Sequence, residues 1–374
     1  MTTCVLAVHA GTTGVAAAAV DATGTVRARG HHELAPHRPA AGQVEHAPDE
    51  IWQAVLGAVR GVLGHVDASE LGSVAITNQR DTVLLWDRDT LGSPRPAVAG
   101  QDRRTTQVCA ALRAAGHEAR VEELTGQGLQ PGRAAPALAW LAEHEPRTWA
   151  LVEEGRYAVG TVDSYLVARM TRGLEHVTDV SNAARTLLHD LDGGGWSGEL
   201  CSLFGVPVDA LPELVPSWGG AATTDPRAFL GLSLPVAGLV ADRSAAHLGL
   251  GCLDAGDASW DDAASSLLVT TGRRPVRTAQ VLTTAAWRSP DGADTFALEV
   301  ASGVDRSAEW LPGVREAAPD LASLRVGDDV DDRLCHDLGE RLGLHVRRAS
   351  AADATLRGAA LLALRPADPA HISR

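Results

Sequence analysis

Short apolar runs separated by turn residues open the chain. Cys4–Val8 and Val15–Val20 are apolar, Gly11–Gly14 lies between them, and Asp21–Gly24 leads into a third run at Thr25–Ala28. Runs of this length, bounded by glycine and small polar residues, are typical of β-strands joined by tight turns. The pattern predicts an antiparallel β-meander at the start of the chain.

A helical period follows the meander. Pro48 precedes two acidic residues, and Ile51, Val55, Val59 and Leu63 recur at intervals of four. Proline and acids suit the first turn of a helix, and this spacing places the apolar side chains on one face. We therefore expect a helix from Pro48 to about Leu63.

Strand and helix patterns then alternate along the rest of the chain. Strands that alternate with helices predict an α/β fold with a mixed sheet. The further elements expected are strands at 74–76, 82–86, 236–240 and 265–270, helices at 103–115, 135–145, 244–249, 333–343 and 354–364, and a strand followed by a helix over 158–171.

Length and a local change in composition indicate two domains. The chain has 374 residues, which is more than a single hydrophobic core usually serves. Residues 216–235 are dense in glycine, proline and threonine, as linkers are. We predict one domain at 1–235 and a second at 236–374.

Composition excludes several classes of function. The formal net charge of −14 argues against a nucleic-acid partner. All 33 basic residues are arginine, and the absence of lysine excludes both a P-loop and a Schiff-base mechanism. No apolar run approaches the roughly 18 residues that a membrane span requires. We expect neither a nucleic acid nor a membrane as partner.

The cysteine spacing and the first eight residues indicate where in the cell the protein is expected. The five cysteines are scattered without paired spacing, which predicts buried thiols and no metal site built from them. Residues 1–8 carry neither a basic region nor a long apolar stretch, so they do not resemble a signal peptide. The expected location is the cytoplasm.

Several motifs, in order, resemble those of the FGGY family of carbohydrate kinases and, within it, of the glycerol kinases. They are Ile-Thr-Asn-Gln-Arg-Asp-Thr at 76–82, the stretch 160–187, and the segments 7–14, 44–52 and 238–246. The resemblance covers nearly all of residues 1–260 and then two fragments, at about 296–311 and 321–364. It implies a ribonuclease-H-like, actin/hexokinase-type fold in which two domains close on a cleft.

The resemblance assigns the catalytic base to Asp242. Phosphoryl transfer to an alcohol needs a carboxylate that accepts the hydroxyl proton, and Asp242 matches the aspartate that does this in the family. Arg243 stands in place of a family glutamine beside the substrate, and its charge would lower the basicity of a nearby Asp242. Taken alone, an aspartate at a strand-to-helix turn is most often a helix cap.

The resemblance also assigns Arg80 and Asp81 to the substrate hydroxyls. Arginine donates several hydrogen bonds from a rigid fork and aspartate accepts them. The family usually has glutamate at the second position, so Asp81 is one methylene shorter. Taken alone, an Arg-Asp pair after a strand is often a surface ion pair of little energy.

Gly11, Thr12 and Thr13 resemble the first phosphate loop of the family. Glycine permits a tight turn, and backbone N–H groups with threonine hydroxyls can donate to phosphate oxygens. On its own, the sequence also fits a plain hairpin turn. His9 replaces the family aspartate that helps to hold the Mg²⁺ of ATP, and an imidazole cannot substitute for a hard anionic oxygen. The alternative for His9 is an ordinary histidine at a strand end.

Two aromatic residues of the family substrate pocket are glycines here. Gly100 and Gly132 stand where those rings would pack on the carbon side of a triol. We therefore expect a wider cleft beside Arg80 and Arg243 that suits a larger or anionic polyhydroxylated compound. The alternative is that the two arginines pair with Asp81 and with Asp242.

The nucleotide side departs further from the family. Asp261 and Asp262 occupy the place of a phosphate turn, and Asp328 and Asp329 replace glycines of a nucleotide turn, so both sites would repel polyphosphate. Beyond Trp310 the chain also omits a long family segment that includes the FGGY signature and much of the second sheet. The second domain is therefore expected to be truncated.

Two functions are weighed on these grounds. The losses favour a pseudokinase, a binding or regulatory protein with little or no phosphotransfer and weak or no use of ATP and Mg²⁺. The alternative is an active kinase that transfers phosphate from ATP, with Mg²⁺, to a carbohydrate or polyol. Either function implies a small polyhydroxylated ligand and is compatible with a homo-oligomer.

Overall fold

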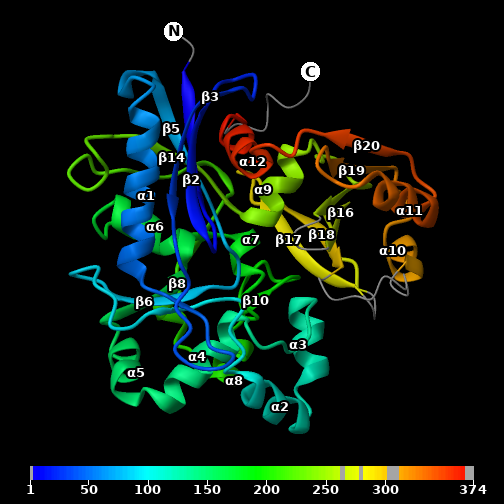
Figure 1. Cartoon of the computed structure of the whole chain (residues 1–374). Helices are drawn as coiled ribbons and strands as arrows, with labels where there is room; N and C mark the ends of the chain where they lie inside the picture. The colour runs from blue at the N-terminus through cyan, green and yellow to red at the C-terminus, as the bar shows by residue number, and fades with distance from the viewer. Residues whose placement is uncertain (1–2, 262–265, 278–280, 301–310, 367–374) are drawn as a thin grey trace.

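The computed structural model describes residues 3–261, 266–277, 281–300 and 311–366. An elongated N-terminal domain carries the first sheet, and a smaller C-terminal domain with the second sheet lies against its upper half (Figure 1). The two-domain ribonuclease-H-like fold expected from the sequence is confirmed by the solved structures reported below. Among the described residues, no helix has both the length and the apolar character needed to cross a membrane.

The expected meander forms one half of the first sheet. β1 pairs antiparallel with β2, which pairs antiparallel with β3, and on its other side β1 pairs parallel with β5. β5 in turn pairs parallel with β14. In spatial order the strands are β13 (Trp218–Thr223), β14 (Pro235–Ala241), β5 (Leu71–Asn78), β1 (Cys4–Ala10), β2 (Gly14–Val20) and β3 (Val26–Glu33).

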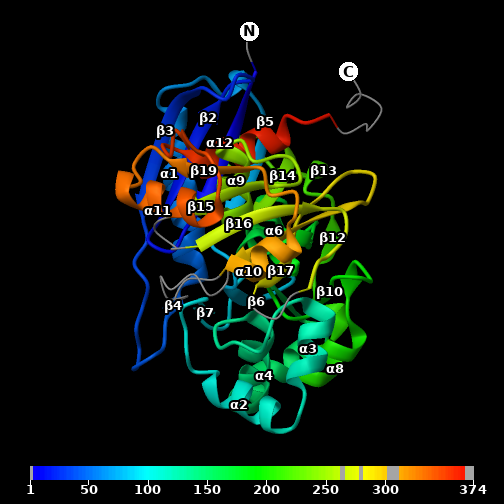
Figure 2. The same cartoon turned by 90° about the vertical axis from the view of Figure 1, so that its right-hand side faces the viewer.

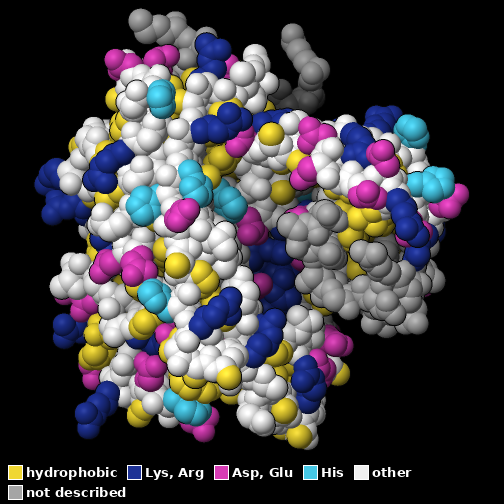
Figure 3. Space-filling model, viewed as in Figure 1, with side chains coloured by type: hydrophobic (Ala, Val, Ile, Leu, Met, Phe, Trp, Pro, Cys, Tyr) yellow, Lys and Arg dark blue, Asp and Glu magenta, His cyan; other side chains and the backbone are white. Residues whose placement is uncertain are grey.

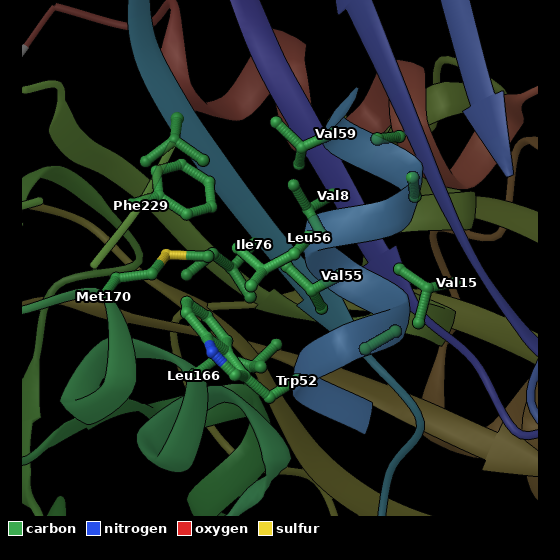
Figure 4. Packing of buried hydrophobic residues seen from close by; sticks show 14 of the residues in the cluster. Val8, Val15, Trp52, Val55, Leu56, Val59, Ile76, Leu166, Met170 and Phe229 are labelled. Carbon is green, nitrogen blue, oxygen red and sulfur yellow. The ribbon is translucent and has the colours of Figure 1, made fainter. Parts of the chain in front are cut away.

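Helices cover both faces of this sheet. α1 (Pro48–Leu63) has the expected bounds and packs on β2 and β3, while α12 (Ala354–Ala363) packs on β1 and β5 from the opposite face. Val55 and Val59 of α1 point at Val8 and Ile76 of the sheet, and all four are fully buried (Figure 4). Burying such a side chain contributes about 1.5–3 kcal/mol, so this apolar face fixes the helix to the sheet.

The lower half of the N-terminal domain holds a second, four-stranded sheet and most of its helices (Figure 2). Its strands, in order, are β4 (Glu45–His46), β7 (Ala97–Val98), β6 (Val83–Asp87) and β8 (Tyr157–Thr161). The helices of this half and its flank are α2 (Thr106–Ala114), α3 (Glu118–Thr125), α4 (Ala134–His144), α5 (Pro146–Glu153), α6 (Val162–Met170), α7 (Val180–Ala183) and α8 (Gly198–Phe204).

Two short strand pairs and two 3₁₀ turns complete this domain. The pairs are β10 (His189–Asp190) with β11 (Gly195–Trp196), and β9 (Val177–Asp179) with β12 (Glu213–Val215); the turns are Ala68–Glu70 and Val208–Ala210.

The sheet of the C-terminal domain repeats the pairing of the first sheet. β15 pairs antiparallel with β16, which pairs antiparallel with β18, and on its other side β15 pairs parallel with β19 and β19 with β20. The expected loss of much of this sheet is therefore wrong. Its strands, in order, are β17 (Leu282–Arg288), β18 (Asp294–Val300), β16 (Ser266–Gly272), β15 (Asp257–Asp261), β19 (Ser323–Gly327) and β20 (Val346–Ala349).

The helices of the C-terminal part are α9, α10 and α11. α9 (Asp242–Gly249) packs on α12, whereas α10 (Leu311–Ala317) and α11 (Asp332–Leu342) lie with the second sheet (Figure 1). Asp331, in the acidic stretch, caps α11 by accepting from the backbone N–H groups of Arg333 and Leu334. The proposed boundary at residue 235 stays a prediction, and the strand that follows it, β14, is paired in the first sheet.

Candidate active site

Three neighbouring strands of the first sheet end at the same level. β1, β5 and β14 are parallel neighbours, and Asn78 at the end of β5 pairs with Ala10 of β1 and with Ala241 of β14. The carboxyl ends of adjacent parallel strands are a common place for ligands. The residues that follow these strand ends are Gly11–Thr13, Arg80–Asp81 and Asp242, so the fold brings the three predicted segments together.

The turn after β1 is anchored to the end of β5. Gly11 donates its N–H to the carbonyl oxygen of Gly14 at 3.0 Å, and the Thr12 hydroxyl donates to the side-chain oxygen of Gln79 at 3.3 Å. In the described part of the chain, the backbone N–H groups of Thr12 and Thr13 donate to no protein acceptor. The turn thus offers two unused donors to a ligand.

Arg80 connects the two domains. Its two terminal nitrogens donate to the carboxylate oxygens of Glu299 on β18, at 2.9 and 3.0 Å, and its Nε lies 3.3 Å from Oδ1 of Asp242. Burial would lower the pKa of Arg80, but Glu299 and Asp242 outweigh burial and raise it. The guanidinium is therefore a permanent cation between two carboxylates.

Asp81 faces two further arginines. Its Oδ1 accepts from Arg133 at 2.7 Å and lies 3.5 Å from Arg185, and these charges hold the pKa of Asp81 below its usual range although burial opposes them. The residue has φ 70°, a left-handed conformation that is costly for a side chain other than glycine. Its two arginine partners fix it in this strained position.

Arg185 and Glu299 complete the charged cluster. Arg185 lies just after α7 and donates to Oε2 of Glu299 at 2.7 Å, and both side chains are almost fully buried. Burial, together with the like charge of Arg133, lowers the pKa of Arg185 to about 10. The arginines Arg80 and Arg185 hold the pKa of Glu299 far below its usual range. Every charge in the cluster has an opposite partner, as buried charges require.

Figure 3 shows this region from outside. Dark blue side chains lie at the bottom of a hollow between the two domains, with acidic side chains beside them. Because the chain contains no lysine, these cationic groups are arginines.

Asp242 begins α9, and its side chain is one-third exposed. Its Oδ1 accepts the backbone N–H of Arg243 at 2.7 Å. Burial raises the pKa of Asp242, and the opposing effects of Arg80 and His9 do not cancel it. The carboxylate is therefore more basic than an ordinary aspartate, as a general base requires.

The Arg243 side chain contacts the second sheet and makes no hydrogen bond to Arg80 or Asp81 among the described residues. Its Nη2 donates to the backbone carbonyls of Ser259 and Ser266, at 3.1 and 2.8 Å, and its Nη1 lies 3.5 Å from Asp261. The guanidinium thus ties α9 to β15 and β16. The expected effect of Arg243 on Asp242 is present, since its backbone N–H lowers the pKa of Asp242 and the two charges interact, but burial outweighs it and the pKa is raised.

His9 lies on β1, next to the Gly11–Thr13 turn, and its charge interacts with that of Asp242. Burial lowers its pKa, although the charge of Asp242 opposes this, so the imidazole is uncharged at neutral pH. Its Nε2 is buried and has no hydrogen-bond partner among the described residues. A neutral ring now occupies the position of the family's metal acid.

Gly100 and Gly132 lie where the chain approaches itself closely. A Cβ added to Gly132 would lie 2.2 Å from the carbonyl oxygen of Gly100, and one added to Gly100 would lie 3.0 Å from Cβ of Asp81. Backbone and Asp81 therefore lie directly against these two positions. The wider cleft expected beside Arg80 and Arg243 stays a prediction. The alternative was that Arg80 and Arg243 pair with Asp81 and Asp242. Arg80 does pair with Asp242, whereas Arg243 pairs with Asp261.

The residues present fit the phosphates of a nucleotide better than a protein-bound cation. The turn at Thr12 and Thr13 has free donors, but the described residues contain no group of three histidine, cysteine or acidic side chains arranged to hold a metal. Asp262, one of the two acids expected to repel phosphate, lies outside the described residues, and Asp261 is paired with Arg243.

Sequence reasoning gave no role to Arg133, Arg185 or Glu299. Arg185 lies within the stretch 160–187, which resembles a family motif. Glu299 stands in the otherwise apolar end of β18, Phe296–Val300. A glutamate between buried apolar residues signals a paired charge. Its partners could not be named, because they lie more than 100 residues earlier in the chain.

Comparison with known proteins shows which family the chain belongs to. The model of the N-terminal domain of the FGGY family of carbohydrate kinases matches residues 4–249. The glycerol kinase of Methylobacterium nodulans is 38% identical over 337 residues, which are 89% of this chain and 66% of that protein. The glycerol kinase of Rhodospirillum centenum is 39% identical over 332 residues, 87% of this chain and 66% of that protein. The chain thus spans about two thirds of their length.

Solved structures show the same fold. Glycerol kinase of Plasmodium falciparum with ADP superposes with a TM-score of 0.88 at 18% identity, covering 96% of this chain and 89% of that one. Gluconate kinase of Lactobacillus acidophilus superposes with a TM-score of 0.83 at 13% identity, covering 97% and 89%. Because the family model matches residues 4–249, well over half of the chain, the chain belongs to the FGGY family of carbohydrate kinases.

Proposed function

We propose that this protein is an ATP-dependent kinase that transfers a phosphoryl group to a hydroxyl of a small polyol or sugar. One observation carries the proposal: the basic carboxylate of Asp242 stands at the end of β14, beside the strand ends that carry Arg80 and the Thr12–Thr13 turn. Similarity to glycerol kinases over most of the chain supports activity better than it supports the loss of activity favoured by the motif changes.

Each residue of the site has a definite role in this proposal. Asp242 accepts the proton of the acceptor hydroxyl as its oxygen bonds to phosphorus. Arg80 donates to substrate oxygens and keeps Asp242 ionised. Asp81, held by Arg133, offers its second oxygen to a hydroxyl. Arg243 acts indirectly, because its side chain holds the second sheet on α9.

ATP and Mg²⁺ would enter between the two domains. The backbone N–H groups of Thr12 and Thr13 and the turn at Gly11 would hold phosphate oxygens. Mg²⁺ bound to those phosphates would neutralise their charge during transfer. With His9 uncharged, this chain supplies fewer anionic ligands than the family does, so the cation would depend on the phosphates and water for most of its coordination.

The test is acceptor-dependent formation of ADP. Purified protein with ATP and Mg²⁺ is offered glycerol, other polyols, aldoses, ketoses and sugar acids, and ADP release is measured with and without each acceptor. Transfer to at least one acceptor that is lost in Asp242→Asn supports the proposal. No acceptor-dependent ADP across the panel would reject it.

A second function, ligand binding without phosphotransfer, is favoured by one observation. His9 places a neutral ring beside Asp242, where the family has a carboxylate for the cation. Under this alternative the protein still binds a polyhydroxylated compound through Arg80 and Asp81. Thermal stabilisation by such a compound, without stabilisation by Mg·ATP and without ADP formation, would support it.

A further inference from the structure

Glu299 is the residue of the second sheet that reaches the charged cluster of the N-terminal domain. It lies on β18, and its side chain is 4% exposed. Its two oxygens accept from both terminal nitrogens of Arg80, and one of them also accepts from Arg185 at 2.7 Å. One carboxylate therefore joins two arginines of the other domain.

The bonds from Glu299 determine how Arg80 is oriented. A guanidinium is planar, and two parallel bonds to one carboxylate fix both its position and its plane. With its terminal nitrogens held in this way, the remaining Nε lies 3.3 Å from Oδ1 of Asp242, in an ion-pair contact. Without Glu299, Arg80 could turn its terminal nitrogens toward Asp242 or Asp81 instead.

The position of Glu299 depends on the docking of the second sheet. β18 is paired with β16 and β17, and apolar contacts join Ala285 and Phe296 of this sheet to Val180, Ala184 and Leu191 of the N-terminal domain. Thr283 also donates its N–H to the carbonyl of Gly126 at 3.0 Å. A shift of this sheet would carry Glu299 away from Arg80.

We propose that Glu299 is a positioning residue for phosphotransfer: it holds Arg80 in place beside Asp242, and it makes this arrangement depend on docking of the second sheet. The inference rests on the function proposed above, because it gives Glu299 a part in the same reaction. Glu299 itself does not contact the reacting atoms.

The charges that face Asp242 determine the sign of the expected effect. Arg80, His9 and Arg243 favour its ionised form, Arg243 through both its charge and its backbone N–H, and Asp81 disfavours ionisation. Loss of the negative charge of Glu299 leaves Arg80 less neutralised and free to turn its terminal nitrogens to Asp242. Asp242 should then become less basic and a poorer proton acceptor.

The experiment compares Glu299→Gln and Glu299→Asp with a matched control on the same strand. Asp294→Asn removes the carboxylate that pairs with Arg288 at 2.6 Å, an ion pair between β17 and β18 outside the cluster. Steady-state kinetics with the best acceptor are measured across pH. Asp242 is also titrated by ¹³C NMR in protein labelled on aspartate carboxyls, with Asp242→Asn used to assign its signal.

For Glu299→Gln we expect kcat to fall at least about tenfold, with the acid limb of kcat/KM and the NMR midpoint of Asp242 both moved to lower pH. Glu299→Asp keeps the charge and should restore the midpoint even where kcat stays low, and it remains informative if the glutamine variant does not fold. Asp294→Asn should resemble the wild type in both measurements.

Two results would overturn the inference. One is a folded Glu299→Gln protein with unchanged kcat and pH profile in an active enzyme. The other is an unchanged titration midpoint of Asp242 in that variant, which decides the matter even if the wild type transfers no phosphate. A wild type without activity would reject the proposed function alone, so the two failures are distinguishable.

Discussion

Gly132 lies so close to Gly100 that a Cβ on Gly132 would come within 2.2 Å of the Gly100 carbonyl oxygen. Gly132 also has φ +93°, a left-handed conformation that other residues adopt only with strain. Position 132 therefore requires glycine in this fold, because both its backbone conformation and the carbonyl of residue 100 exclude a side chain.

This contact predicts a large effect of a single methyl group at position 132. Gly132→Ala should destabilise the protein by about 2 kcal/mol or more, because strain and overlap with backbone add. Gly155→Ala is a matched control, since Gly155 has φ +74° but open space around it. That control should cost only about 1 kcal/mol. Urea unfolding measures the free energy of unfolding of both variants. Equal losses of stability would show that the backbone around residue 132 shifts to make room for the added methyl group.

A carboxylate at position 9 should improve the use of the cation. His9→Asp would place a second acid beside Asp242, where the imidazole is neutral, and carboxylates are the ligands that Mg²⁺ prefers. We expect Mg·ATP to raise the Tm of His9→Asp more than that of the wild type. His9→Asn, which is similar in size but uncharged, serves as control. The same Mg²⁺-dependent shift in both variants would contradict the role assigned to charge at this position.

Buried His247 predicts a loss of stability in mild acid. Its ring nitrogens contact the hydroxyls of Ser259 and Thr270 at 2.7 and 2.8 Å, and burial, followed by the charge of Arg243, lowers its pKa to about 3. The unfolded chain binds a proton at about pH 6.5. The stability contributed by the neutral ring is therefore present above pH 6.5 and falls by about 1.4 kcal/mol per pH unit below it.

Free energies of unfolding measured at pH 7.5 and 5.5 check the predicted loss of stability in acid. The difference between the two should shrink in His247→Gln, whereas His336→Gln, at an exposed position, should keep the wild-type difference. An unchanged pH dependence in the His247 variant would mean that other groups cause the acid sensitivity.

Asp163 predicts a contribution to stability that falls as pH rises, opposite in sign to that of His247. It accepts from Thr161 and Thr178 at 2.5 and 2.6 Å, but burial raises its pKa to about 6, from 3.8. Its contribution to stability is therefore complete below pH 3.8 and is lost as pH rises through about 6. Asp163→Asn should gain on the wild type by up to about 3 kcal/mol between pH 4 and pH 7. A difference in unfolding free energy that does not vary with pH would contradict this assignment.

Local sequence determined the elements and much of the candidate site. Apolar spacing fixed the bounds of α1 because one face of that helix must be buried on the sheet. The ends of β1, β5 and β14 placed Gly11–Thr13, Arg80–Asp81 and Asp242 together, since parallel neighbours in register end at one edge. The helix required only a short window of sequence, whereas the three site segments were assigned by the family resemblance, and the parallel sheet explains why they lie at one edge.

Partners distant in sequence were decided only by the tertiary structure. Arg80 meets Glu299 across 219 residues, and Arg185 meets it across 114; no periodicity encodes such pairs. Likewise, the second sheet forms six strands that repeat the pairing of the first sheet, and Gly132 lies against the backbone of Gly100. The physical reason is common to all three. Buried charges must be paired and the interior must be closely packed, and the groups that do this come from distant parts of the chain that only the folded structure brings together.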